Sequence, residues 1–65
     1  MNKPIELILV IIPTLNEVDN LPGIVPLTLN QDPRIEVLIV DDDSSDGTGL
    51  LADGISDKSD RVHVL

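Results

Sequence analysis

The sequence contains no cysteine, phenylalanine, tyrosine or tryptophan. Without cysteine, disulfides, zinc–thiolate sites and thiol catalysis are excluded. Positive charge is also scarce, because 4 lysines and arginines stand against 12 aspartates and glutamates, for a formal charge of −8. Nucleic-acid binders need a basic surface and often aromatic rings that stack on bases. This composition therefore argues against nucleic acid as a partner.

Long hydrophobic runs are missing as well. The longest extends over six residues, from Leu7 to Ile12, whereas a membrane-spanning helix needs about 20. No small-residue cleavage pattern follows the N-terminus, so a signal peptide is not expected. The sequence predicts a cytoplasmic chain with no membrane span in these 65 residues.

Hydrophobic residues still make up 42% of the chain, which is ordinary for a globular protein and too high for a disordered acidic tail. A chain of this size buries only about 60% of its unfolded surface and is marginally stable by itself. We therefore expect one small domain at most.

Three apolar, β-branched stretches predict strands. Residues 5–12 are almost continuously apolar, which is typical of a strand buried on both faces of a parallel sheet, and Pro13 is expected to end this strand. Residues 35–40 repeat the pattern, and residues 62–65 begin a third strand.

The stretches between these strands have helical spacing. Residues 21–29 place apolar side chains on one helix face, with Asp19 or Asn20 as the cap and a kink or break expected at Pro26. The second predicted helix has Asp46 or Thr48 as its cap. Its apolar side is expected to consist of Leu50, Leu51 and Ile55. The order β-α-β-α-β predicts an α/β fold with parallel strands and right-handed crossovers.

Polar clusters follow the first two predicted strands, at residues 13–17 and 41–48. Ligands of open parallel sheets bind beyond the carboxyl ends of the strands. If the two strands are neighbours, Glu17 and Asp42 flank one crevice, where a carboxylate can accept both hydroxyls of a ribose or an N–H pair of a base. The same residue types also serve as ordinary loop and cap residues. Neither GxGxxG nor GxxxxGK[ST] occurs, which argues against a dinucleotide fold and a P-loop.

The motifs IIPTLNE, NLPGIV, VDDDSSDGTG and RVHVL occur in this order across nearly the whole chain. Together they resemble the N-terminal half of family 2, GT-A type glycosyltransferases, closest to the dolichyl- or polyprenyl-phosphate mannose synthase branch. The resemblance implies that residues 1–65 are the N-terminal part of a single, truncated Rossmann-like GT-A domain that binds a nucleotide sugar. It also implies mannose transfer from GDP-mannose to a polyprenyl phosphate, at the cytoplasmic face of a membrane.

The resemblance further implies a nucleotide-binding set, consisting of Pro13, Leu15, Glu17, Val40 and Asp42. Glu17 would contact the ribose, and Val40 and Asp42 would meet the base. Leu15 stands where the family more often has tyrosine, so packing against the base would be aliphatic there.

No catalytic or metal-binding residue is assigned within this chain. The family's aspartate-x-aspartate metal motif, acceptor site and catalytic base would lie beyond Leu65, so Mg²⁺ or Mn²⁺ is expected only in a full-length protein. A sugar diphosphate is an anion, and this chain carries a charge of −8, so like charges repel without a bridging cation. We expect that the isolated 65 residues do not transfer mannose.

Other interpretations stay open from the sequence. One is a family 2 transferase that uses a different sugar nucleotide. Residues 42–53 nearly match an EF-hand calcium loop with Gly47 in place, although they follow a predicted strand rather than a helix. The LIVDDD segment resembles the acidic strand end of a receiver domain, although these acids follow the second strand. A remnant that merely folds is the last alternative.

Several single residues also carry expectations. His63, the only histidine, is expected to face solvent or pack at a sheet edge. Thr14 and Asn16 are expected to hold the turn after the first strand through side-chain to backbone bonds. A solvated surface is expected for Asp57, Lys58, Asp60 and Arg61.

Overall fold

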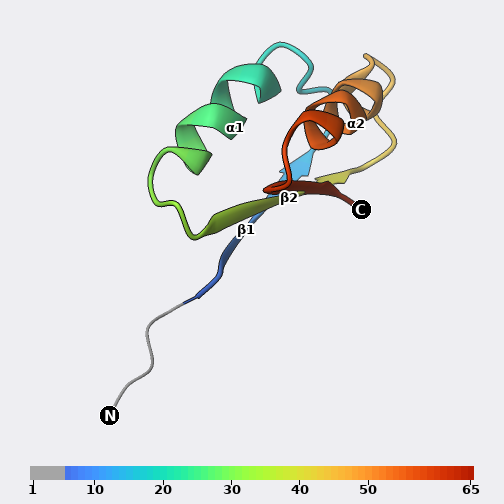
Figure 1. Ribbon diagram of the computed structural model, residues 1–65. Helices are drawn as coiled ribbons and strands as arrows, with labels where there is room; N and C mark the ends of the chain where they lie inside the picture. Colours follow the sequence, from blue (N-terminus) through green and yellow to red (C-terminus); the bar gives the residue numbers. More distant parts are fainter. Residues whose placement is uncertain (1–5) are drawn as a thin grey trace.

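The computed structural model describes residues 6–65. Along the chain lie β1 (Ile8–Thr14), α1 (Leu21–Leu29), β2 (Ile35–Asp41), α2 (Thr48–Lys58) and β3 (Val62–Val64). The three strands form one parallel sheet in the order β1-β2-β3. Both helices lie against the same face of this sheet (Figure 1). The predicted α/β fold with alternating strands and helices is confirmed.

Strands β1 and β2 are neighbours along their whole lengths. Ile8 pairs with Ile35 at one end, and Thr14 pairs with Asp41 at the other. Strand β3 joins the opposite side of β2, where Val62 pairs with Val37. Because β1 and β2 are parallel and in register, their carboxyl ends reach the same level of the sheet.

The predicted end of β1 at Pro13 is wrong, because the strand continues to Thr14 and Pro13 pairs with Val40. Within residues 6–65, β1 lies at the edge of the sheet, and an edge strand tolerates a residue that cannot donate a ladder hydrogen bond. The strand begins at Ile8, and the predicted start at Ile5 lies outside the described residues.

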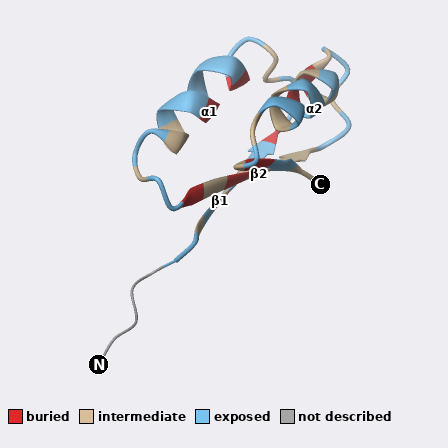
Figure 2. Ribbon diagram, viewed as in Figure 1, coloured by how far each residue is buried: buried red, intermediate tan, exposed pale blue. Residues whose placement is uncertain are grey.

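The prediction that β1 is buried on both faces is also wrong. Its residues alternate between partly buried side chains that pack on the core, such as Val10, and exposed ones. Leu9 is 49% exposed and Ile11 is 59% exposed. The chain steps in one direction from β1 to β3, and successive right-handed crossovers in one direction place both helices on the same side. The opposite face of the sheet is not covered by these helices. Figure 2 shows exposed residues along β1.

The core lies between β2 and the two helices. Val37 and Ile39 of β2 are completely buried. The buried apolar residues that pack together are Leu21, Val25, Ile35, Val37, Ile39, Ala52 and Val62. Because β2 has a neighbouring strand on each side, its side chains that face the helices are shielded from solvent.

A kink or break is predicted at Pro26, and a break is excluded because helix α1 runs continuously through this residue. Pro22 lies in the first turn, where a missing N–H removes no helical bond. Pro26 loses its bond to the carbonyl of Pro22, and because both prolines are exposed, water can reach that carbonyl. Asn20 occupies the predicted cap position, but its side chain makes no capping bond.

Helix α2 follows Gly47, whose φ of 93° lies in the left-handed region that favours glycine. Gly47 occupies the cap position of α2, so the predicted cap at Asp46 or Thr48 is wrong, although Asp46, one residue earlier, accepts the N–H of Thr48 at 3.0 Å. The prediction for Leu50 is wrong, because this side chain is 81% exposed. The inward positions recur at helical spacing, and they are Thr48, Leu51, Ala52 and Ile55.

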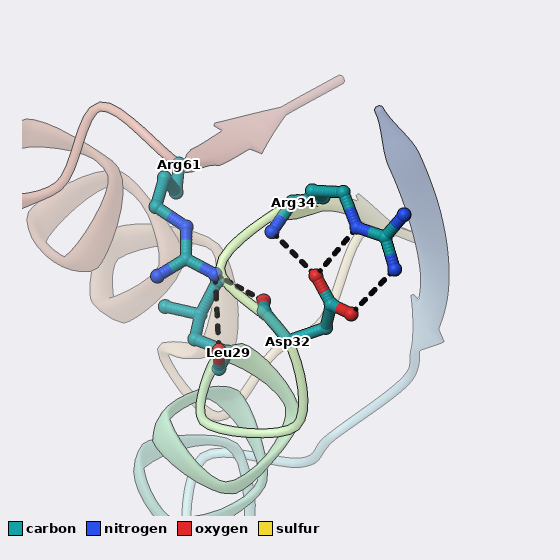
Figure 3. A network of polar contacts seen from close by, with 4 residues as sticks. All are labelled: Leu29, Asp32, Arg34 and Arg61. Carbon is teal, nitrogen blue, oxygen red and sulfur yellow. Dashed lines mark hydrogen bonds and ion pairs between the residues drawn. The ribbon is translucent and has the colours of Figure 1, made fainter. Parts of the chain in front are cut away.

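Arg61 is not part of a solvated surface, which corrects its prediction. Its Nε donates to the carbonyl of Ile35 at 2.9 Å, and its Nη2 donates to the carbonyls of Leu29 at 3.0 Å and Asp32 at 2.8 Å. The last carbonyls of a helix have no partner inside it. Arg61 therefore joins the end of α1 to the starts of β2 and β3 (Figure 3).

The second arginine in this region binds a side chain instead of the main chain. Arg34 donates to the Asp32 carboxylate through Nε at 2.9 Å and Nη2 at 2.8 Å. These hydrogen bonds lower the pKa of Asp32 to about 2. The pair is exposed, and Figure 3 shows it beside Arg61.

Candidate functional site at the carboxyl ends of β1 and β2

The structure brings the predicted nucleotide-binding residues to one edge of the sheet. Pro13 and Val40 are paired on β1 and β2. Leu15 and Glu17 follow β1 directly, and Asp42 follows β2. The N–H of Asp42 donates to the carbonyl of the last β1 residue at 2.9 Å, which continues the pairing of the two strands by one step. That these residues bind a nucleotide stays a prediction.

Side chains of the β2–α2 loop hold the backbone of the β1–α1 loop. The N–H groups of three consecutive residues, 16–18, each donate to a side-chain oxygen of residues 44–48, which make up the end of that second loop and the first residue of α2. In chain order the acceptors are Ser44 Oγ at 2.8 Å, Thr48 Oγ1 at 2.9 Å and Asp46 Oδ2 at 3.1 Å. The two loops therefore form one fixed unit beyond the strand ends.

Asn16 returns a bond to the β2–α2 loop. Its Oδ1 accepts the N–H of Ser45 at 3.0 Å. Its φ of 54° lies in the left-handed region, which asparagine tolerates better than most residues. Asn16 makes a side-chain to backbone bond, but this bond links two loops, so the prediction that it holds the turn after β1 is wrong. The Thr14 hydroxyl donates to the Asp41 carboxylate instead of the backbone, which corrects its prediction as well.

Asp41 is the centre of a polar cluster beneath these loops. Its carboxylate accepts the Thr14 hydroxyl at 2.7 Å and the Ser44 N–H at 3.0 Å. A bond from the Ser44 hydroxyl, followed by that from Thr14, lowers the pKa of Asp41. A Cβ at Gly49 would lie 3.3 Å from Asp41 Oδ2, so glycine lets α2 start close to this carboxylate. Asp41, the first of the three consecutive aspartates, therefore has a structural role, because its carboxylate is bonded within the protein.

The two acids predicted to meet the nucleoside differ in their surroundings. Glu17 is partly buried, and its Oε2 accepts the side-chain N–H of Asn20 at 2.9 Å. Its carbonyl also accepts the N–H groups of Asn20 and Leu21, at 3.1 Å and 2.9 Å, where α1 begins. Asp42 is exposed. Glu17 thus has a fixed position, and Asp42 presents its carboxylate to solvent.

The calcium-loop alternative does not fit this geometry. Asp46 is engaged by Thr48, whose hydroxyl bond is the main cause that lowers the pKa of Asp46. Asp53, the expected last ligand, lies on α2. Within residues 6–65, no group of three or more acidic or histidine side chains is arranged to hold a metal ion.

His63 is exposed, as expected, and its Nε2 lies 2.6 Å from Glu36 Oε1 on the neighbouring strand. In the part of the chain that the structure describes, neither helix has the length and apolar character needed to cross a membrane.

A parallel α/β sheet with polar loops beyond adjacent strand ends is the architecture of nucleotide-binding α/β proteins. Comparison with known protein families identifies one family within this class. Residues 9–65 match the model of glycosyl transferase family 2, and the chain belongs to this family. This membership decides against the receiver-domain alternative.

Two relatives are mannosyl-transferring proteins by name. The chain is 50% identical to polyprenol monophosphomannose synthase of Mycolicibacterium smegmatis, over 97% of this chain and 24% of the relative. It is 45% identical to undecaprenyl-phosphate mannosyltransferase of Micrococcus luteus, over 89% of this chain and 24% of the relative. The chain thus spans about a quarter of the length of these relatives. No solved structure matches it.

Proposed function

We propose that this chain provides the nucleotide-binding edge of a polyprenyl-phosphate mannosyltransferase whose donor is GDP-mannose. The observation that carries the proposal is the gathering of Glu17 and Asp42 at the ends of two adjacent strands. The identity to both relatives extends over nearly the whole of this segment and supports mannose as the sugar.

The chemistry of this edge suits a nucleoside. Glu17 offers a carboxylate on a fixed backbone, which can accept the two hydroxyls of a ribose. Asp42 can accept an N–H pair from the edge of guanine. Pro13, Val40 and Leu15 supply apolar surface beside them.

Among residues 6–65, the two loops beyond the ends of β1 and β2, residues 15–20 and 42–47, contain no lysine or arginine that could contact a diphosphate. The amides of residues 16–18 are already bonded to side-chain oxygens, and the nearby charges are acidic. The expectation that Mg²⁺ or Mn²⁺ serves a full-length protein remains a proposal. So do the lipid-phosphate acceptor, the cytoplasmic membrane face and the absence of nucleic acid.

The base preference tests the proposal most directly. Calorimetric titrations with GDP and UDP, on the unchanged chain and on Asp42→Ala, separate the base from the rest of the nucleotide. We expect GDP to bind more tightly than UDP, and Asp42→Ala to weaken GDP binding about tenfold, the worth of a hydrogen bond to a charged group. Asp53→Ala, which removes the same charge from the exposed surface of α2, is the matched control and should leave GDP binding unchanged.

Equal affinities for GDP and UDP would contradict the guanosine assignment, and an unchanged GDP affinity in Asp42→Ala would remove this residue from the site. A second assay follows radiolabelled mannose from GDP-mannose to a polyprenyl phosphate. Because no catalytic base is assigned to this chain, we expect no transfer by the 65 residues alone.

A further inference from the structure

The backbone that carries Glu17 is held by residues outside the predicted nucleotide-binding set. The N–H of Glu17 donates to Thr48 Oγ1 at 2.9 Å, and the N–H of Val18 donates to Asp46 Oδ2 at 3.1 Å. Thr48 is the first residue of α2 and Asp46 lies in the loop just before it, 31 and 28 residues further along the chain than their respective donors. Successive amides near a left-handed residue often form a concave anion site, but here side chains of the protein occupy it.

Thr48 and Asp46 act as a pair. Thr48 is completely buried, and its hydroxyl donates to Asp46 Oδ1 while accepting the N–H of Glu17. Asp46 uses its other oxygen, Oδ2, for Val18. Asp46 also accepts the N–H of Thr48, so the two side chains are bonded to each other at the start of α2, and each accepts one N–H of the β1–α1 loop.

We propose that Thr48 and Asp46 are positioning residues for Glu17. They fix the loop backbone, Asn20 then orients the Glu17 carboxylate, and the nucleoside meets a group that is already in place. A loop that must be ordered during binding weakens affinity by the entropy of that ordering, and a preformed loop avoids this loss. The inference rests on the proposed nucleotide-binding function, because it concerns the same site.

Conservative substitutions separate this role from general stability. Thr48→Val keeps the shape of the side chain and removes the oxygen that accepts the Glu17 amide. Thr48→Ser keeps that oxygen and is the rescue variant. Ser56→Ala is the control, because it removes a second hydroxyl of α2, on a partly buried residue, whose bond to the Val62 carbonyl is 2.9 Å long.

The experiment combines amide hydrogen exchange, read by NMR, with calorimetric titration of GDP. In Thr48→Val we expect faster exchange at the Glu17 amide and about fivefold weaker GDP binding, the equilibrium worth of one hydrogen bond. Thr48→Ser should restore both quantities. Ser56→Ala should lower the unfolding midpoint and leave GDP affinity unchanged.

Unchanged GDP affinity in Thr48→Val, together with faster exchange at Glu17, would overturn the positioning role and leave the nucleotide site standing. Absence of GDP binding by the unchanged chain would instead overturn the proposed function, and the positioning role with it. If Thr48→Val does not fold, Asp46→Asn gives the same decision, because Asp46 is exposed and an amide side chain keeps only one of the two acceptor oxygens.

Discussion

Replacing Arg61 by methionine should destabilise the fold far more than its position near the surface suggests. Methionine keeps much of the apolar stem and removes the guanidinium, so three backbone carbonyls lose their donor. Hydrogen bonds to charged groups contribute about 1.5–3 kcal/mol each. Arg61 is partly exposed, so water compensates for part of the lost hydrogen bonding. We therefore reduce the contribution of each bond to about 1 kcal/mol.

The expected loss is therefore about 3 kcal/mol in the free energy of unfolding. Domains have about 0.05–0.15 kcal/mol of stability per residue, so a chain of 65 residues has about 3–10 kcal/mol in total. Arg61→Lys should recover part of the loss, because one ammonium group cannot reach all three carbonyls.

Urea unfolding followed by far-ultraviolet circular dichroism is the appropriate assay, since the chain has no aromatic residue to serve as a fluorescent probe. With a urea slope of about 1 kcal/mol per molar, the midpoint should fall by about 3 M in Arg61→Met. Arg34→Met is the matched control, because Arg34 bonds an exposed carboxylate, and its midpoint should change little. Equal midpoints for the two variants would refute the reasoning.

Two other predictions concern acid stability and the one-sided sheet. Hydrogen bonds lower the pKa of Asp41 and of Asp46, so their contribution is complete above the usual value of 3.8 and is lost only as the pH falls through the lower folded values. Amides 16–18 should keep their exchange protection at about pH 5, and losing it there would contradict this. Ile39→Ala should cost about 3 kcal/mol and Ile11→Ala less than about 1 kcal/mol in urea unfolding; equal losses would show that both faces are covered.

The sequence predicts the order of the elements and the gathering of its candidate residues at the carboxyl ends of β1 and β2, because both follow from local patterns. Alternation of β-branched runs with helical spacing requires parallel strands, and parallel neighbours bring residues 13–17 and 41–48 to one edge. The difference between Asp41, which is bonded within the protein, and the exposed Asp42 is not predictable in this way. Three adjacent aspartates look alike in the sequence, and only the positions of Thr14 and Ser44 make Asp41 internal.

What the sequence did not predict depends on partners distant in the chain. An apolar run does not specify which of its faces receives a helix, so Leu9 and Ile11 were expected to be buried. Arg61 binds main-chain carbonyls, and every residue has such a group, so no motif marks its partners. The same holds for the amide of Glu17, which left Thr48 recognisable only as a helix cap.

The order β1-β2-β3 has a consequence for any additional strand of this sheet. A strand beside β3 would continue the present winding and bring its helix to the side already covered. A strand paired with the other edge of β1 would reverse the winding, and a right-handed crossover would then carry its helix over Leu9 and Ile11. The point of reversal would fall beside Leu15 and Glu17, where doubly wound sheets open a crevice for their ligands.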